Sequence, residues 1–164
     1  MKHMRLWAVV GAFSLLVALV LSTLARSQGA AEPVFSGGSY LTTITDTAGN
    51  FGSRSVITLH ADHTMLAVDS GQQGPIFYFG SQLGDWKPAG GHQIVARAIN
   101  FAYPQGPNGQ GVVRTDYVIN LSPDRRHVTG TETVTAFPLQ AENPYGEGGI
   151  LVASAIFQGD RIEP

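Results

Sequence analysis

Three groups of side chains in the sequence could do chemistry. The first is His60-Ala-Asp62-His63, where two imidazoles and a carboxylate within four residues could face one metal ion. The same residues are typical of a hairpin turn, because Asp bonds to nearby backbone and the position after it tolerates a left-handed conformation. Side chains at the tip of a turn splay outward. We therefore favour the turn and assign no metal site.

The second group is polar and consists of Arg114, Asp116 and Glu132. Arg114 and Asp116 lie on one face of a run with period two over residues 112–121, and Glu132 interrupts a row of small and apolar residues in the run 126–137. On adjacent strands, Arg114 and Glu132 could pair. Facing inward, the group could shift a carboxyl pKa or polarise a ligand carbonyl. Facing outward, it would be a surface ion-pair ladder of small energetic value, which we favour.

The third group is aromatic. Aromatic residues gather at the expected loops and strand ends, where they line an apolar ligand pocket or fill the core. The candidate ligand contacts are Phe77, Phe79, Trp86, Phe101, Tyr103 and Tyr117. The run Ile76-Phe-Tyr-Phe79 is too apolar to stay in water, so we expect it to form a lid over one end of the fold, near Trp86.

No nucleophile set accompanies these groups. Ser70, Ser81 and Ser154 lack the strand–turn–helix context of a nucleophile elbow. We therefore assign no catalytic residue and expect no cofactor.

Strands and turns must position these residues, and no helix is expected after residue 31. Runs rich in β-branched residues alternate with Gly, Pro, Asn and Asp turns, such as Asn108-Gly109. Strands joined by such short turns are antiparallel, because parallel strands need a long crossover. The expected strands cover 39–46, 53–60, 64–69, 81–87, 92–103, 112–121, 126–137 and 150–162.

These runs predict an all-β fold: an antiparallel, up-and-down, eight-stranded barrel over residues 39–164, preceded by one N-terminal hydrophobic helix. On residues 112–121 we expect Val113, Tyr117, Ile119 and Leu121 inside, with Arg114, Asp116 and Asn120 outside. Closure removes the exposed sheet edges. A barrel of this size is filled by side chains or holds one small ligand.

The N-terminal segment is typical of export. Lys2, His3 and Arg5 precede an apolar run over residues 6–25, and small residues up to Ala31 fit cleavage before Glu32. A run of this length could also stay as a membrane anchor. Residues 1–31 are thus a signal peptide or an anchor, and 32–38 a flexible lead-in. Both alternatives place the barrel outside the cytoplasm, secreted or periplasmic, with membrane contact through this segment alone.

Composition narrows the function further. The 164 residues fit one domain, and a formal net charge of −2 gives no basic footprint for nucleic acid. Without cysteine, the chain has no disulfide, thiolate metal site or cysteine nucleophile. The oligomeric state is left open.

The quoted strands and turns also carry a resemblance. Ser39-Tyr-Leu-Thr-Thr-Ile-Thr, Ile57-Thr-Leu-His-Ala-Asp-His-Thr64, Gly84-Asp-Trp86 and Val128-Thr-Gly-Thr131 resemble small exported bacterial proteins of unassigned function with a calycin barrel, the lipocalin and avidin type. We expect a module that binds an apolar small molecule or lipid at its open end. One alternative is a cofactor-free cyclase or isomerase that uses Tyr117, Arg114 or Glu132. Another is a ligand-free structural or interaction protein of the cell envelope. Inward orientation of Arg114 or Glu132 would favour the enzyme.

Overall fold

A computed structural model describes residues 35–72, 77–104 and 110–164. The compact unit Ser36–Pro164 is built, in its described part, from strands and the turns between them. The strands are β1 (Gly37–Asp46), β2 (Phe51–His60), β3 (Thr64–Asp69), β4 (Phe77–Phe79), β5 (Gln82–Gly90), β6 (Gln93–Pro104), β7 (Gly111–Leu121), β8 (His127–Pro138) and β9 (Ile150–Arg161).

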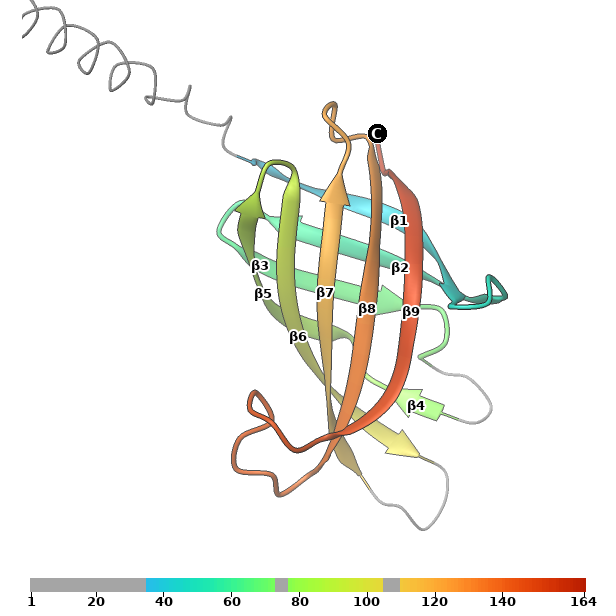
Figure 1. Ribbon diagram of the computed structural model, residues 1–164, viewed down its shortest axis with the longest axis vertical. Coiled ribbons are helices and arrows are strands. Elements are labelled where there is room, and N and C mark those ends of the chain that lie inside the picture. The colour runs from blue at the N-terminus through green and yellow to red at the C-terminus, as the bar shows by residue number, and fades with distance from the viewer. Residues whose placement is uncertain (1–34, 73–76, 105–109) are drawn as a thin grey trace, which may run out of the picture. The chain divides into compact units, whose positions relative to one another are not determined.

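The strands form one closed antiparallel sheet (Figure 1). Following hydrogen bonds around it gives β6-β5-β3-β2-β1-β9-β8-β7, and the pairing of β6 with β7 closes the ring. The short β4 lies outside the ring, where Phe79 pairs with Ala102 of β6. Removing β4 from the nine strands leaves eight, so the predicted up-and-down eight-stranded barrel is confirmed.

The predicted N-terminal helix, signal or anchor lies outside the described residues. Among the residues that are described, no helix has the length and apolar character to cross a membrane.

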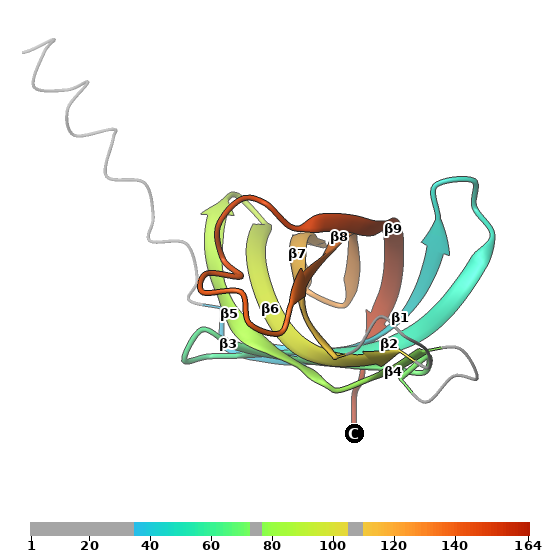
Figure 2. The ribbon, with the colours of Figure 1, turned by 90° about the horizontal axis from the view of Figure 1, so that it is seen from below.

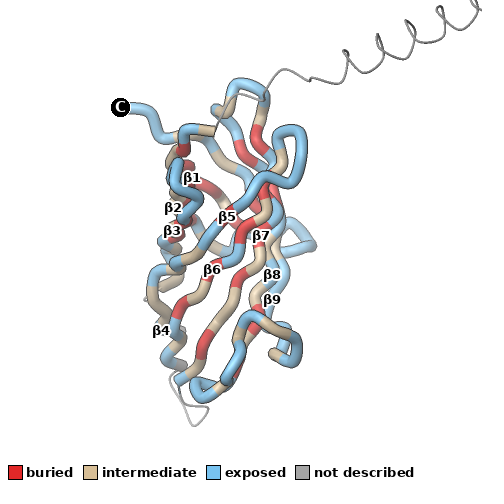
Figure 3. Tube along the Cα trace, turned by 90° about the vertical axis from the view of Figure 1, so that its left-hand side faces the viewer, coloured by how far each residue is buried: buried red, intermediate tan, exposed pale blue. Residues whose placement is uncertain are grey.

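In each strand, every second side chain points into the barrel, and these side chains form its core. Figure 3 shows the resulting alternation of buried and more exposed positions along β6 and β7. Glycine at an inward position lets two neighbouring strands approach each other closely. At Gly84 of β5, a Cβ atom would lie 1.9 Å from the carbonyl oxygen of Arg97 on β6, so no other residue fits there without backbone movement.

One end of the interior, the closed end, is a dense core. It lies around the β2–β3 turn and the turn at 122–126. The large side chains there are at most 4 % exposed: Tyr40, Leu59, Met65, Trp86, Ile119 and Phe157. The indole Nε1 of Trp86 donates to the carbonyl oxygen of His60 at 2.9 Å, and its ring stacks on His63 with centroids 4.4 Å apart. The Tyr40 hydroxyl donates to the carbonyl oxygen of Arg125 at 3.1 Å.

At the other end, the open end, the inward side chains are less buried. It lies at the lower ends of β6–β9 in Figure 1. There β9 pairs with β8 as far as Ile150 but with β1 only from Ala155 onward, so the β6–β9 wall extends past β1. Figure 2 looks from this end and shows the strands in a ring, with the β1–β2 hairpin flared away from it. Inward positions here are small or apolar: Ala102, Val113, Val134 and Ala136 are half-buried, and Ala153 is exposed.

Candidate functional site

The faces of β7 are as the period-two pattern predicts. Tyr117, Ile119 and Leu121 are buried inside the barrel, whereas Arg114, Asp116 and Asn120 lie on the outer face. Val113 is at an inward position and is half-buried, because it lies at the open end.

Glu132 corrects one sequence expectation. The prediction that Glu132 belongs to an outward ion-pair ladder is wrong, because Glu132 points inward from β8. Its partner in register is Tyr117, while Arg114 pairs with Thr135, so the expected Arg114–Glu132 pair does not form. The physical reason is parity: Glu132 shares the inward face of Val128, Gly130 and Val134.

A set of polar side chains meets inside the barrel above the open end. We call it the inner polar cluster, and it consists of Ser53, Asp69, Gln82, Asn100, Tyr117 and Glu132. The Tyr117 hydroxyl donates to Oε1 of Gln82 at 2.5 Å and also interacts with the Glu132 carboxyl. Asp69 accepts from the Ser53 hydroxyl at 2.8 Å and from the Gly71 backbone N–H at 2.6 Å.

Asn100 lies beside Gln82 on the inner face, because its neighbour Ile99 pairs with Leu83. Asn100 is 5 % exposed, and its Nδ2 donates to the carbonyl oxygen of Gly80 at 3.0 Å. Its Oδ1 has no hydrogen-bond partner within the described part of the chain. A buried acceptor without a partner is costly, so this atom is a candidate contact for a ligand.

Burial sets the protonation states of the two central groups. Desolvation raises the pKa of Glu132 from 4.5 to about 7, and the nearby Asp69 carboxylate contributes in the same direction. Burial, followed by the charge of Glu132, raises the pKa of Tyr117 well above its ordinary 10.0. Near neutral pH, Glu132 can therefore accept or donate a proton, while Tyr117 is a neutral hydroxyl.

An apolar wall leads from the open end to this cluster. Along β7 and β8 the inward pairs are Val113 with Ala136, then Thr115 with Val134, then Tyr117 with Glu132. The four residues from Ala136 to Glu132 span about 13 Å of extended strand. A molecule entering here would pass small apolar side chains before it reached a carboxyl group.

Few of the predicted aromatic contacts join the site. Phe79 shares the inward side of Ala102 at the open end, and Tyr117 lies in the cluster. Phe101 and Tyr103 occupy outward positions of β6 and are 50 % and 45 % exposed. The side chain of Phe77 lies outside what the structure describes.

The predicted proximity of residues 76–79 to Trp86 is wrong for residues 77–79, and Ile76 lies outside the described residues. Residues 77–79 are an edge strand paired with residues 102–104 of β6. Trp86 pairs with Ala96, which precedes Ala102 on β6 by six residues, or about 20 Å of strand. Its indole is part of the core at the closed end.

Arg114 serves the outer face. Its Nη1 donates to the carbonyl oxygens of Gly146 at 2.6 Å and Pro144 at 3.2 Å, and its Nε lies 2.8 Å from the Asp116 carboxylate. The guanidinium also lies 5.2 Å from the ring centroid of Phe137. Arg114 therefore fastens the β8–β9 loop to the barrel wall and takes no part in the inner polar cluster.

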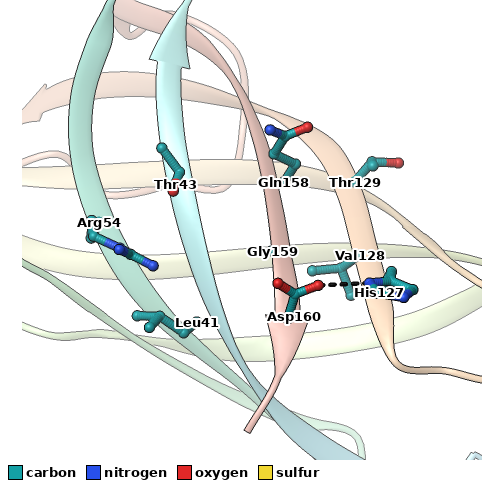
Figure 4. Close-up of a pocket in the computed structure, with 9 residues that line it drawn as sticks. All are labelled: Leu41, Thr43, Arg54, His127, Val128, Thr129, Gln158, Gly159 and Asp160. Carbon is teal, nitrogen blue, oxygen red and sulfur yellow. Dashed lines mark hydrogen bonds and ion pairs between the residues drawn. The ribbon is translucent and has the colours of Figure 1, made fainter.

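The outer surface carries a groove of about 300 Å³ across β2, β1, β9 and β8 (Figure 4). Its lining residues are Leu41, Thr43, Arg54, His127, Val128, Thr129, Gln158, Gly159 and Asp160. The His127–Asp160 pair at 2.6 Å has both side chains more than 60 % exposed, at 65 % and 79 %. This pair is exposed to water, whereas the inner polar cluster is buried and contains an acceptor without a partner among the described residues, so the cluster is the better candidate.

The turn interpretation of residues 60–63 is confirmed. Asp62 accepts from the Thr64 backbone N–H at 3.0 Å and from its hydroxyl at 2.7 Å, and His63 has a positive φ of 73°. Over the described ranges, no group of three or more His, Cys, Asp or Glu residues is placed to hold a metal ion.

Comparisons with known proteins give no family. The chain matches no protein-family model, no curated protein and no solved structure. The closed eight-stranded barrel is compatible with the calycin type of fold.

Proposed function

We propose that this chain is an exported, calycin-like binding protein that takes up a small amphipathic molecule through its open end. The apolar part of the ligand lies against Val113, Val134 and Ala136, and its polar group reaches Glu132. One observation carries the proposal: along β8, the inner wall changes from partly exposed apolar residues to a carboxyl group within four residues. The basic and apolar N-terminal segment supports export.

The filling of the barrel restricts the ligand to one half. Side chains at the closed end are nearly inaccessible, with Ile119 and Phe157 each at 1 % exposure. Protein cores are packed as densely as organic crystals, so no ligand enters there without displacing side chains. At the open end, covering the apolar wall would stabilise a complex by about 25 cal/mol for each Å² removed from water.

Two neighbouring residues give a matched test. Ala153 pairs with Val134 on the inner face of the open end, and Ser154 pairs with Thr133 on the outer face. We expect the neutral dye Nile red to show a saturable rise in emission with the full chain. Ala153→Trp should abolish the response by filling the opening, and Ser154→Trp should preserve it. No saturable response from the unaltered protein would refute binding and favour a ligand-free structural barrel.

The inward orientation of Glu132 favours a second candidate function, a cofactor-free isomerase or cyclase. A carboxyl with a pKa of about 7 is well matched to general base catalysis at neutral pH, and Tyr117 supplies a neutral hydrogen-bond donor. In such a reaction the Glu132 carboxylate would take a proton from a carbon next to a ligand carbonyl and return it to another position.

Hydrogen exchange tests this candidate before any substrate is known. The full chain would be incubated with 2-octanone in D₂O, and deuterium at the carbons next to the carbonyl followed by NMR. The enzyme hypothesis predicts exchange above the buffer rate that Glu132→Gln abolishes, while that variant still binds Nile red. Equal rates in both proteins would refute it.

A further inference from the structure

From the inner polar cluster we infer that the polar group of the ligand is a primary ammonium, so that the ligand is a small aliphatic amine. This inference rests on the proposed function, because it names the chemical class of the molecule bound at the open end. It is carried by two observations that concern different atoms: the balance of hydrogen-bond donors and acceptors, and the balance of charge.

Acceptors outnumber donors in the cluster. The Tyr117 hydroxyl donates to Gln82, the Ser53 hydroxyl to Asp69, and Nδ2 of Asn100 to the Gly80 carbonyl. Among the described residues, the amide nitrogen of Gln82 is the remaining side-chain donor of the cluster. Oδ1 of Asn100 is buried without a partner in the described part of the chain. The Glu132 carboxyl, once ionised, has two acceptor oxygens, and the Tyr117 hydroxyl is the hydrogen-bonding side chain found beside it among the described residues. An ammonium group offers three donors and no acceptor, which complements this set.

The charges of the cluster have the same sign. Glu132 and Asp69 are close enough for each to act on the cluster electrostatically, and both are acidic. On the other strands of this half, the inward residues Thr42, Ser55, Gln82, Asn100 and Ala155 are uncharged. Asp46, in register with Ala155, is acidic and exposed and accepts hydrogen bonds from its own turn. Arg97 and Arg114 lie on the outer face, and Arg161 is at the closed end, where it donates to the Gly37 carbonyl. Within the described residues, the open half therefore lacks an inward cation.

Other polar groups fit this cluster less well. A hydroxyl brings one donor and no charge, so it leaves the acidic pair uncompensated. A carboxylate brings a third negative charge next to Glu132 and Asp69, which is unfavourable at short range. An ammonium satisfies the buried acceptors and compensates the charge that burial makes costly.

Three ligands with eight carbon atoms each test the inference. Octylamine, 1-octanol and octanoate would compete with Nile red on the full chain at pH 7.5. We expect octylamine to bind at least about tenfold more tightly than 1-octanol, as a charge-assisted hydrogen bond allows, and octanoate to bind most weakly. Glu132→Gln should remove the advantage of octylamine and leave 1-octanol within about twofold. Glu142→Gln, in an exposed loop, is the matched control and should change neither value.

The pH dependence gives a second readout. Octylamine stays protonated between pH 6 and pH 8, while Glu132 loses its proton near pH 7. Octylamine binding should therefore strengthen across this range in the unaltered protein and stay flat in Glu132→Gln. Asp69→Asn, which keeps the shape of the side chain, is the second variant and should also weaken octylamine selectively.

The outcomes separate the two proposals. If 1-octanol binds as tightly as octylamine, or octanoate binds best, the ammonium inference is wrong and the binding function stands. If Nile red and all three alkyl compounds fail to bind, the binding function itself is refuted, and the inference with it. Loss of all ligands equally in Glu132→Gln would also overturn the inference, because the residue would then support the site without discriminating charge.

Discussion

Glu132 makes the barrel less stable as the pH rises, and its replacement by glutamine should reverse this. The folded protein holds the Glu132 proton with a pKa of about 7, against 4.5 for a glutamate carboxyl that is exposed to water. Between these values the folded state binds a proton that the unfolded state has lost. The free energy of unfolding therefore falls as the pH rises from 4.5 to 7.

The size of the effect follows from the two pKa values. Their difference, 7 − 4.5, is about 2.5 pH units, and each unit corresponds to about 1.4 kcal/mol. The ionised Glu132 should therefore cost about 3 kcal/mol above pH 7, and nothing below pH 4. Glutamine keeps the shape of the side chain and carries no charge, so most of this cost should disappear in Glu132→Gln.

Urea unfolding from pH 4 to pH 8.5 measures the difference between the two proteins. We expect Glu132→Gln to match the unaltered protein at pH 4 and to exceed it by about 2–3 kcal/mol at pH 8. Taking the difference cancels Asp46, Asp62 and Asp124, whose lowered pKa values affect both proteins alike at acid pH. Glu142→Gln, in the exposed loop, should show no such trend. A difference between Glu132→Gln and the unaltered protein that stays constant with pH would refute the burial argument.

Three further substitutions test packing and the outer contacts, each by denaturant unfolding. Tyr117→Ala should cost about 3–5 kcal/mol, because it empties a site that is 2 % exposed; a cost below 1 kcal/mol would contradict its place in the core. Arg114→Ala should cost about 1.5–3 kcal/mol, more than the surface pair that the sequence suggests, because its side chain is 13 % exposed and holds two loop carbonyls. Gly84→Ala should cost about 3 kcal/mol or more through its clash with backbone, whereas Gly52→Ala, with its nearest contact at 3.4 Å, should be tolerated.

The strands and their faces could be predicted because burial alternates with period two. On β7 the alternate positions that are apolar in the sequence are also the ones that are buried, as at Tyr117, Ile119 and Leu121. The inward orientation of Glu132 was harder to predict, because charged residues normally face water. That general preference outweighed the alternation along β8, which puts Glu132 on the inner face. Asp69, Gln82 and Asn100 were missed for the same reason. A polar residue at an inward position of an otherwise apolar strand is the signal that would have found them.

Positions along the barrel axis were less predictable than faces. The stagger between strands depends on how the whole ring closes, which no single strand records. Trp86 and residues 77–79 are close in sequence, yet β5 carries the tryptophan to the closed end while β4 stays at the open end. A three-residue strand such as β4 is also too short to show a period.

The pairing of β1 with β9 has a consequence for the way this chain becomes a barrel. Tyr40 pairs with Arg161, so the contact that completes the ring joins residues separated by 161 − 40 = 121 positions. Until the last strand is available, β1 and β8 both present unpaired edges, and the earlier strands can form only an open sheet. Contacts of such long range make folding slow. A chain that leaves the ribosome or crosses a membrane from its N-terminus therefore reaches its native topology only after nearly all of it has emerged, and a truncation before β9 should leave an aggregation-prone sheet.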